Sequence, residues 1–408
     1  MKQLCFTRLA LCALCGASMT LMPGFTLAGW FSQGSGTTYE LYSVHFPVDA
    51  LTGFAVGYYE IILKTTNGGS NWVIQSSGAP FRYLNSVHFP QNASTGYAVG
   101  GYIGIRTILK TTNGGANWVA QTSGTNQWLN YVHFPVNAST GYIVGSYGTI
   151  LKTTNGGTAW DSLTSGTSMG LYSVHFPVDD LTGYAVGDNG TILKTTNGGA
   201  TWTPQSGSSP WLFSVHFPVD ALTGYVVGNG GTIRKTTNGG TAWVTQTSGT
   251  TNELKSVHFP VDALTGYAVG YSGIILKTTD GGAFWFRQFP STSNILNSAH
   301  FPTNALTGYV VGQGGIILKT TDGGSGVEET AESGGQKLEI RITATPNPFT
   351  SFSSVLGHER DRFTLYDVSG RRVGVYRGDR IGEGLKAGVY FVRAEGGGAK
   401  PVRVVKVR

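Results

Sequence analysis

Seven histidines recur along this chain at an even spacing, and imidazole is a common ligand of transition metals. Each stands in the tripeptide His-Phe-Pro, and successive copies are 41 to 45 residues apart. Zinc requires ligand nitrogens at about 2.0–2.1 Å, whereas side chains related by a sevenfold repeat stand around an axis and do not converge on one ion. We therefore expect no metal and no cofactor, and interpret the histidines as hydrogen-bonded packing residues. They are His45, His88, His133, His175, His216, His258 and His300.

Carboxylates that interrupt the repeat form a second group, because a single active site on a repetitive scaffold needs residues that the other copies lack. Two suitably separated carboxylates hydrolyse glycosides. No motif pairs the candidates here, so we expect no enzyme, and a secreted glycan hydrolase is kept as the alternative. The candidates are Glu40, Glu60, Asp180, Asp188 and Glu253.

A lysine also recurs in every copy, in the motif Leu-Lys-Thr-Thr or a close variant of it, from Lys64 to Lys319. One lysine per repeat is typical of a side chain whose stem packs on the protein while its ammonium lies in water. We expect that structural role for the whole set.

The repeat itself predicts the fold. Its consensus, SVHFPVDALTGYAVGxxGTILKTTNGGxxWxxQxSGT, contains four short β-rich runs separated by turn residues. Four strands in about 42 residues are typical of a propeller blade. The Asn-Gly-Gly and Asp-Gly-Gly segments suit a hairpin turn that needs positive φ. The sequence therefore predicts an all-β, seven-bladed β-propeller over residues 29–325.

The seventh copy breaks off, and the missing part lies at the other end of the chain. The stretch TTDGGSGVEETAES, residues 320–333, has Val327 where the other copies have tryptophan. The segment GWFSQGSGTT, which begins at residue 29, matches the end of a repeat through Trp30 and Gln33. We expect this segment to supply the last strand of the seventh blade and so to close the ring.

The motif T-x-N/D-x-G-x-x-W, as in TTNGGATW at 195–202, resembles the Asp-box of bacterial neuraminidase repeats. The whole unit, with its GYAVGxxGTILKTTNGG core, resembles propellers of the photosystem II assembly factor type. The resemblance covers roughly residues 29–324 and implies a seven-bladed propeller in which the Asp-box is a structural hairpin. An assembly factor for an envelope or photosystem-type membrane complex is therefore a further alternative. The arginine-rich patch that such factors use for docking has no counterpart in this sequence.

The two faces of such a disc differ in their loops. The face with the PVDALTG and TTNGG turns is nearly constant, while the opposite face varies and is rich in aromatic residues with an occasional arginine. These residue types anchor interfaces and stack on sugars. We expect this variable face to bind a glycan or a surface protein. Its candidate binding residues are Tyr58, Tyr59, Phe81, Arg82, Tyr83, Tyr102, Trp128, Tyr147, Trp211 and Tyr271.

The N-terminal residues 1–28 are typical of a secretory signal peptide, because basic residues precede an apolar core and then small residues. A lipoprotein anchor at Cys12 or Cys15 is the alternative. All three cysteines of the chain lie in this segment, so the exported protein would hold together by packing without disulfides.

The last eighty residues change in composition. An acidic, glycine-containing stretch, 326–337, is typical of a linker, and residues 338–408 contain alternating β runs that favour a small β-sandwich. The motifs PNPF, LYDVSGRRV and AGVYFVR, followed by a basic C-terminal strand, resemble the sorting domain of the type IX secretion system. The resemblance implies export through the periplasm to the cell surface or medium, with that machinery as a partner of residues 338–408. An ordinary immunoglobulin-like module is the alternative.

Charge argues against nucleic acid as a partner. Residues 29–324 carry 12 Lys/Arg and 12 Asp/Glu, whereas residues 346–408 carry 12 and 6. Proteins that bind nucleic acid present a basic face, and here the excess lies in the tail. We expect a monomeric, exported, non-enzymatic binding propeller.

Overall fold

The computed structural model describes residues 29–78, 83–102, 105–205 and 209–324, together with 344–345, 354–355, 362–367, 372–377, 380–386, 388–394 and 402–406. The chain divides into two compact units, Met1–Glu328 and Glu329–Arg408, which are treated separately. The predicted signal peptide and linker lie outside the described residues, as do Phe81 and Arg82. Among the described residues, no helix is both long and apolar enough to cross a membrane.

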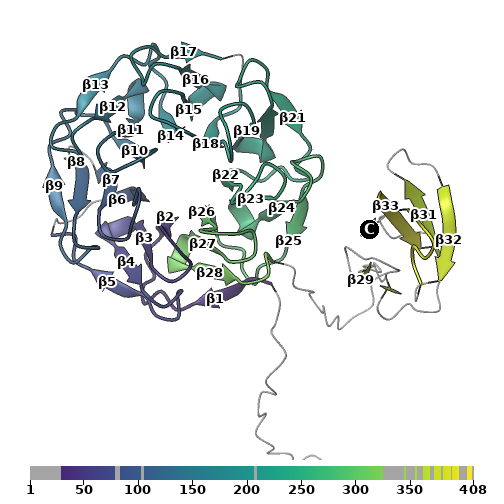
Figure 1. Ribbon diagram of the computed structural model, residues 1–408. Coiled ribbons are helices and arrows are strands. Elements are labelled where there is room, and N and C mark those ends of the chain that lie inside the picture. Colours follow the sequence, from purple (N-terminus) through teal and green to yellow (C-terminus); the bar gives the residue numbers. More distant parts are fainter. Residues whose placement is uncertain are drawn as a thin grey trace, which may run out of the picture. The chain divides into compact units, whose positions relative to one another are not determined.

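The first unit is a ring of seven four-stranded antiparallel sheets (Figure 1), which confirms the predicted all-β propeller of seven blades. In the first six blades the strands follow one another along the chain, from the inner strand at the axis to the outer strand at the rim. The predicted division of each repeat into four strands is therefore correct.

Each blade has four strands, named from the inner strand outward. Blade 1 has β2 (Leu41–His45), β3 (Gly53–Gly57), β4 (Ile62–Thr65) and β5 (Val73–Gln75). Blade 2 has β6 (Tyr83–His88), β7 (Gly96–Tyr102), β8 (Ile105–Thr111) and β9 (Val119–Gln121). Blade 3 has β10 (Leu129–His133), β11 (Gly141–Gly145), β12 (Ile150–Thr153) and β13 (Asp161–Leu163). Blade 4 has β14 (Leu171–His175), β15 (Gly183–Gly187), β16 (Ile192–Thr195) and β17 (Thr203–Pro204).

Blade 5 has β18 (Leu212–His216), β19 (Gly224–Gly228), β20 (Ile233–Thr236) and β21 (Val244–Gln246). Blade 6 has β22 (Leu254–His258), β23 (Gly266–Gly270), β24 (Ile275–Thr278) and β25 (Phe286–Gln288). Blade 7 has β26 (Leu296–His300), β27 (Gly308–Gly312), β28 (Ile317–Thr320) and β1 (Phe31–Gln33). Short 3₁₀ turns join the second and third strands in every blade except blade 2. They are η1 (Tyr58–Glu60), η2 (Ser146–Gly148), η3 (Asp188–Gly190), η4 (Asn229–Gly231), η5 (Tyr271–Gly273) and η6 (Gln313–Gly315).

The ring is closed by the beginning of the chain, as predicted. Strand β1 pairs antiparallel with β28, and the two strands lie side by side in Figure 1 although they are at opposite ends of the unit. Trp30, which precedes β1, is only 8% exposed and meets the rings of Tyr267 and Phe301 edge to face. Trp30 therefore occupies the place that tryptophan takes in the other six blades.

The blade core is built around the phenylalanine of His-Phe-Pro. In blade 1 this ring, Phe46, stacks on Tyr309 of blade 7 at 3.9 Å and meets Trp72 edge to face. A Cβ at Gly53, the first residue of β3, would overlap with the Phe46 ring. Glycine is therefore required at this position because the ring packs directly on the strand backbone.

The Asp-box is a structural hairpin turn between the third and fourth strands, which confirms its expected role. In blade 1 the Thr65 hydroxyl donates to Asn67 Oδ1 at 3.0 Å and accepts the backbone N–H of Gly69 at 2.9 Å. Gly68 and Gly69 have φ of 67° and 83°, which is the left-handed region that favours glycine. These bonds fix the orientation of the Gly68 carbonyl.

That carbonyl joins one blade to the next. Tyr97 and Lys110 are directly opposite each other on β7 and β8. The Tyr97 hydroxyl donates to the Gly156 carbonyl of blade 3 at 2.9 Å, and Lys110 Nζ donates to the same oxygen at 2.7 Å. Six blade boundaries have this arrangement, and the last one, from Tyr309 and Lys319 to Gly68, joins blade 7 to blade 1.

The structural role expected of the repeated lysines is confirmed, but the protein holds their ammonium groups instead of leaving them to water alone. In all seven blades the ammonium donates to the glycine carbonyl of the next Asp-box at 2.7–2.8 Å. It also lies 5.4–5.6 Å from the centre of the aromatic ring on the neighbouring strand. The hydrogen bond could not be predicted from the motif around each lysine, because the acceptor carbonyl lies about one repeat away in the sequence.

In the second unit, strand β31 (Arg362–Asp367) lies between β32 (Arg372–Arg377) and β33 (Gly388–Ala394), and β34 (Val402–Lys406) completes a four-stranded sheet. A separate pair is formed by β29 (Ala344–Thr345) and β30 (Ser354–Val355). The second unit has one buried apolar cluster among its described residues, formed by Phe363, Leu365, Ile381 and Val392. Strands predicted around Phe363 and Phe391 are therefore present, while a sandwich and the PNPF motif of a sorting domain remain predictions.

Blade 1 provides a natural test of the joint between blades, because Phe54 stands where the other six blades have tyrosine. We expect Phe54→Tyr to add hydrogen bonds to the Ala93 and Gly114 carbonyls and to raise the free energy of unfolding by about 1 kcal/mol. Urea denaturation of the full chain, followed by circular dichroism, measures the change. Tyr225→Phe, the reverse substitution in blade 5, should lower stability by a similar amount. A neutral or destabilising Phe54→Tyr contradicts the assigned role of the hydroxyl.

Candidate binding site in the central cavity

The inner strands of the seven blades enclose a cavity of about 810 Å³. Its lining comes from successive residues of these strands, so that one strand contributes to both ends of the cavity. In blade 1, Tyr42 lies toward the face that carries the 3₁₀ turns, and His45 lies three residues further toward the opposite face. We call the Tyr42 end the mouth and the His45 end the floor.

The floor is a closed ring of the seven repeated histidines. Neighbouring imidazole centroids are 4.7–5.2 Å apart all the way round, including the contact between His300 and His45. Five of the rings accept a backbone N–H from the next blade through Nδ1, at 3.3–3.4 Å. His133 instead places Nε2 3.2 Å from the Phe176 carbonyl oxygen, and His258 Nδ1 has no partner. These bonds agree with the hydrogen-bonded role expected of the set.

Burial keeps these imidazoles neutral. Desolvation lowers the pKa of all seven, and neighbouring histidines lower the pKa of His45, His88, His175, His216 and His300 further. The pKa of His133 and of His258 falls to about 4. A charged imidazole could not accept the backbone N–H at Nδ1, so neutrality and the bonds between blades support each other. No group of three or more His, Cys, Asp or Glu in the described part of the chain could hold a metal ion.

The wall of the mouth carries residues that the sequence analysis missed. The position three residues before each histidine lies on the inner strand and differs from blade to blade, although its neighbours are nearly constant. This variation next to an invariant histidine was the available signal, because the innermost strand of a propeller faces the axis. From blade 1 to blade 7 the residues are Tyr42, Asn85, Asn130, Tyr172, Phe213, Lys255 and Asn297.

The structure brings some of the predicted binding residues together beside blades 1 and 2. Tyr83 lines the cavity, and its ring centroid is 4.8 Å from that of Tyr58. Tyr59 stacks on Tyr39 with centroids 5.2 Å apart. Tyr102 is described only as part of the β7 backbone. Arg82 and Phe81 lie outside the described residues.

A second aromatic group lies beside blades 4 to 6. Tyr172 is 5.3 Å from Phe213 and 6.4 Å from the predicted Trp211, measured between ring centroids. Lys255 lies over Phe213 at 4.1 Å and over the predicted Tyr271 at 5.3 Å from the ring centre. Phe213 and Tyr172 come from the missed inner-strand position, and they connect loop residues to the cavity wall.

The remaining two predicted residues differ in position. Trp128 lines the cavity and is 50% exposed, whereas Tyr147 is 74% exposed and is not part of the lining. The predicted set is therefore not one continuous patch. Three of the predicted residues with described side chains line the cavity, namely Tyr83, Trp128 and Tyr271. Four do not belong to its lining, namely Tyr58, Tyr59, Tyr147 and Trp211.

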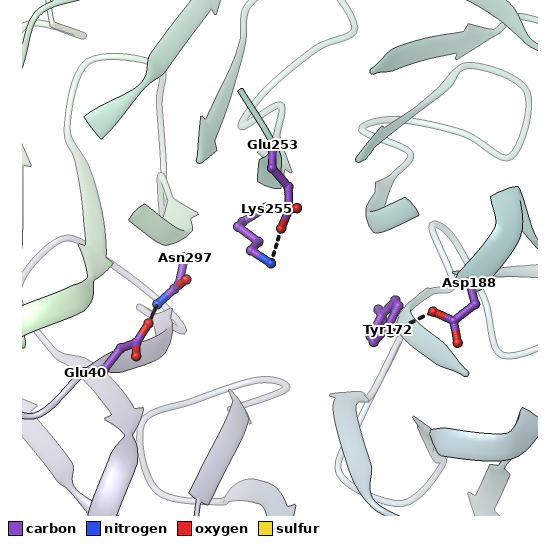
Figure 2. Close-up of polar contacts among 6 residues, drawn as sticks. All are labelled: Glu40, Tyr172, Asp188, Glu253, Lys255 and Asn297. Carbon is purple, nitrogen blue, oxygen red and sulfur yellow. Dashed lines mark hydrogen bonds and ion pairs between the residues drawn. The ribbon is translucent and has the colours of Figure 1, made fainter. Parts of the chain in front are cut away.

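The polar groups at the mouth are paired with close neighbours (Figure 2). Asn297 donates to Glu40 Oε1 at 3.0 Å, and the Tyr172 hydroxyl donates to Asp188 Oδ1 at 2.7 Å. Lys255 forms an ion pair with Glu253. Burial and the Asp188 contact together raise the pKa of Tyr172 above its ordinary value.

These contacts bear on the carboxylates considered for glycoside hydrolysis. Glu40, Asp188 and Glu253 reach the mouth from different blades, and each is engaged by a different side chain. Glu60 lies elsewhere and accepts a hydrogen bond from Ser77 at 3.1 Å. The arrangement suits a surface that recognises a ligand through aromatic rings and fixed polar groups.

The sequence profile described as photosynthesis system II assembly factor YCF48 matches residues 81–169, 159–245, 205–292 and 246–343. Among solved structures, the chain is similar to "YCF48 bound to D1 peptide", with 19% identity and a TM-score of 0.60 over 73% of this chain and 96% of the other. It is also similar to YCF48 from Cyanidioschyzon merolae, with 22% identity, a TM-score of 0.60, and 72% and 99% of the two chains covered.

A structure of RRP9 WD40 repeats has the same TM-score of 0.60 at only 9% identity, over 72% of this chain and 97% of the other. Similarity at these identities reflects the propeller fold and carries no function with it. No match was found among curated protein sequences.

The histidine ring predicts a loss of stability in mild acid. The folded pKa values lie below the ordinary value of about 6.5. As the pH falls below about 6.5, the unfolded chain therefore binds more protons than the folded chain. The free energy of unfolding decreases as the pH decreases. Each histidine contributes up to about 1.4 kcal/mol per pH unit.

Urea denaturation of the full chain at pH values from 7.5 to 5 measures this slope, which gives the number of protons taken up on unfolding. The double variant His133→Gln, His258→Gln should have a shallower slope, because it lacks two of the buried imidazoles. A stability that does not change between pH 7 and pH 5.5 contradicts the assignment of neutral histidines.

Proposed function

The chain belongs to the photosynthesis system II assembly factor YCF48 family, and we propose from this that it is a non-enzymatic propeller which holds a segment of a partner protein during assembly of an envelope complex. The observation that carries the proposal is the aromatic mouth of the central cavity. Rings from loops and inner strands of blades 1 to 6 gather there beside fixed polar groups.

The composition of the mouth favours a protein partner. Tryptophan and tyrosine are enriched among residues that dominate protein interfaces. Trp128 is half exposed, so a partner can remove it from water without disturbing the core. A solved structure of similar fold is described as bound to a D1 peptide, which supports a peptide segment as the kind of ligand this cavity accepts.

The charges of the mouth indicate what kind of segment fits. Lys255 is paired with Glu253, and Arg234 donates to the Ser209 carbonyl at 2.7 Å outside the cavity lining. Arg287 lies over the ring of Phe289. The described propeller arginines, Arg106, Arg234 and Arg287, belong to blades 2, 5 and 6, so we propose that recognition rests on aromatic contact and hydrogen bonds rather than on a cluster of arginines. We propose a segment with apolar or aromatic side chains rather than an acidic one.

Glycan binding and glycoside hydrolysis receive less support. Aromatic rings also stack on sugars, so a glycan is the alternative ligand at the same mouth. Hydrolysis needs two carboxylates on either side of one bond, whereas Glu40, Asp188 and Glu253 are each engaged by a different neighbour. We propose that the protein has no glycosidase activity.

We also propose that the protein is exported and reaches the cell surface or medium. This rests on the signal-like segment 1–28 and on the resemblance of residues 338–408 to a type IX sorting domain. An assembly factor carried to the outside would serve a complex of the envelope or surface. The export proposal and the partner proposal rest on different residues and can fail separately.

Substitution of the mouth aromatics tests the partner proposal. We expect Trp128→Ala to weaken capture of the partner about tenfold or more, because an interface anchor contributes about 2 kcal/mol or more. Tagged full-length protein, chemical cross-linking and mass spectrometry measure capture of one stoichiometric partner. Tyr147→Ala is the matched control, since it removes a more exposed ring outside the cavity lining.

Equal loss in the Trp128 and Tyr147 variants contradicts a site at the mouth. A parallel glycan array separates the alternatives, because binding to a glycan without any protein partner would overturn the assembly proposal.

Deletion of residues 338–408 tests the export proposal. We expect the truncated propeller to remain in the periplasm, because the proposed sorting domain is gone while the signal segment is intact. Protease treatment of whole cells, followed by detection of the propeller, measures surface exposure. Digestion of the truncated protein at the same rate as the full chain contradicts the role of the tail.

A further inference from the structure

We propose that the floor of the central cavity is a binding site for an oxyanion, such as a carboxylate, sulfate or phosphate group, held by uncharged N–H and O–H donors of the inner strands. The site is distinct from the aromatic mouth and does not depend on the proposed partner. Two rings of donors support the proposal, and both are produced by the way neighbouring blades are joined.

The first ring is formed by the histidines. In His45, His88, His175, His216 and His300, Nδ1 accepts a backbone N–H from the next blade, as in the 3.3 Å bond from Phe89 to His45. A neutral imidazole that accepts at Nδ1 carries its proton on Nε2. No described residue accepts a hydrogen bond from these five Nε2–H groups. All five histidines line the cavity.

The second ring lies two residues earlier on the inner strands and consists of serines. Ser43, for example, accepts the Val87 backbone N–H of the next blade at 3.2 Å. Six blades have this bond, at 3.2–3.4 Å, and blade 3 has Tyr131 at this position. Each serine thereby uses a lone pair on the neighbouring blade and keeps its O–H as a donor. Ser43, Ser214, Ser256 and Ser298 line the cavity.

The floor therefore offers hydrogen-bond donors in excess of acceptors, and it carries no formal charge among the described lining residues. The charged lining residues Glu40 and Lys255 lie at the mouth, where each has a partner. Water can satisfy donors and acceptors equally, but a surface of convergent donors favours a ligand that only accepts. Uncharged donors in a partly enclosed site are also strong partners for an anion, since hydrogen bonds to an ionised acceptor are about twice as strong as neutral ones.

The size of the ring selects an oxyanion over a bare metal ion. A regular heptagon with sides of 4.7–5.2 Å has its centre about 5.4–6.0 Å from each imidazole centroid. A metal on the axis would lie well beyond the roughly 2.0–2.1 Å of a zinc–nitrogen bond. An oxyanion extends its oxygens about 1.5 Å from the centre, and N–H···O bonds add about 2.9 Å, which brings the oxygens within reach of the inner edges of several rings.

Nuclear magnetic resonance of the ¹⁵N-histidine-labelled full chain tests the site directly at pH 8, where the buried imidazoles are neutral. We expect at least five imidazoles with the proton on Nε2. Their signals should shift saturably on addition of sodium sulfate, phosphate or acetate, compared with chloride at equal ionic strength. Calorimetry should give one anion per chain. The sulfate and phosphate arms distinguish a tetrahedral anion from a carboxylate, which acetate represents.

Two matched variants identify the donors. His216→Phe removes one of the five Nε2–H donors that line the cavity, so we expect about two- to tenfold weaker anion binding. His133→Phe removes an imidazole whose Nε2 faces the Phe176 carbonyl and which does not line the cavity, so binding should be unchanged. Absence of a saturable shift with all three anions, protons on Nδ1, or equal weakening in both variants overturns the proposal. If a variant does not fold, the titration of the unmodified chain decides.

Discussion

One carbonyl oxygen in each Asp-box turn holds the propeller together. In six of the seven turns it accepts a hydrogen bond from a tyrosine and one from a lysine of the preceding blade, and these two side chains are opposite each other on adjacent strands. In blade 2 the Gly114 carbonyl accepts from Lys64 alone among the described side chains, because Phe54 replaces the tyrosine. The oxygen points correctly only because the threonine and asparagine of its own turn hold two left-handed glycines in place. The turn is thus both the end of one hairpin and the acceptor for its neighbour. This explains why turn, tyrosine and lysine recur together in nearly every copy.

The architecture could be predicted from the sequence to an unusual degree. A repeat of about 42 residues with four β-rich runs leaves few alternatives to a propeller, and the interrupted seventh copy pointed to Trp30 at the other end of the chain. The destination of the lysines could not be predicted in the same way. Lys110 reaches Gly156, and the distance between them depends on how two blades pack, which no pattern within one repeat encodes.

The candidate site was predicted only in part, for a similar reason. Loop aromatics are conspicuous in the sequence, but whether a given ring reaches the axis depends on the tilt of its blade and the course of its loop. Trp128 does so and Tyr147 does not. The inner-strand residues Tyr172 and Phe213 were hidden because they alternate with constant core positions. The same inner strands thus carry the uniform histidines of the floor and the varying residues of the wall. The histidines join the blades in a nearly symmetric way, while the wall residues form an asymmetric recognition surface.

Closure of the ring by β1 also constrains the order in which the protein can be made. Among the described propeller strands β1 is synthesised first, and it pairs with β28, almost three hundred residues later in the chain. Six blades can form from local hairpins as they appear, but the seventh waits until the last strand has been synthesised. Until then, β1 has no strand with which to pair. A chain that crosses a membrane from its N-terminus would have to keep this first strand available throughout passage, and the finished ring would form only on the far side.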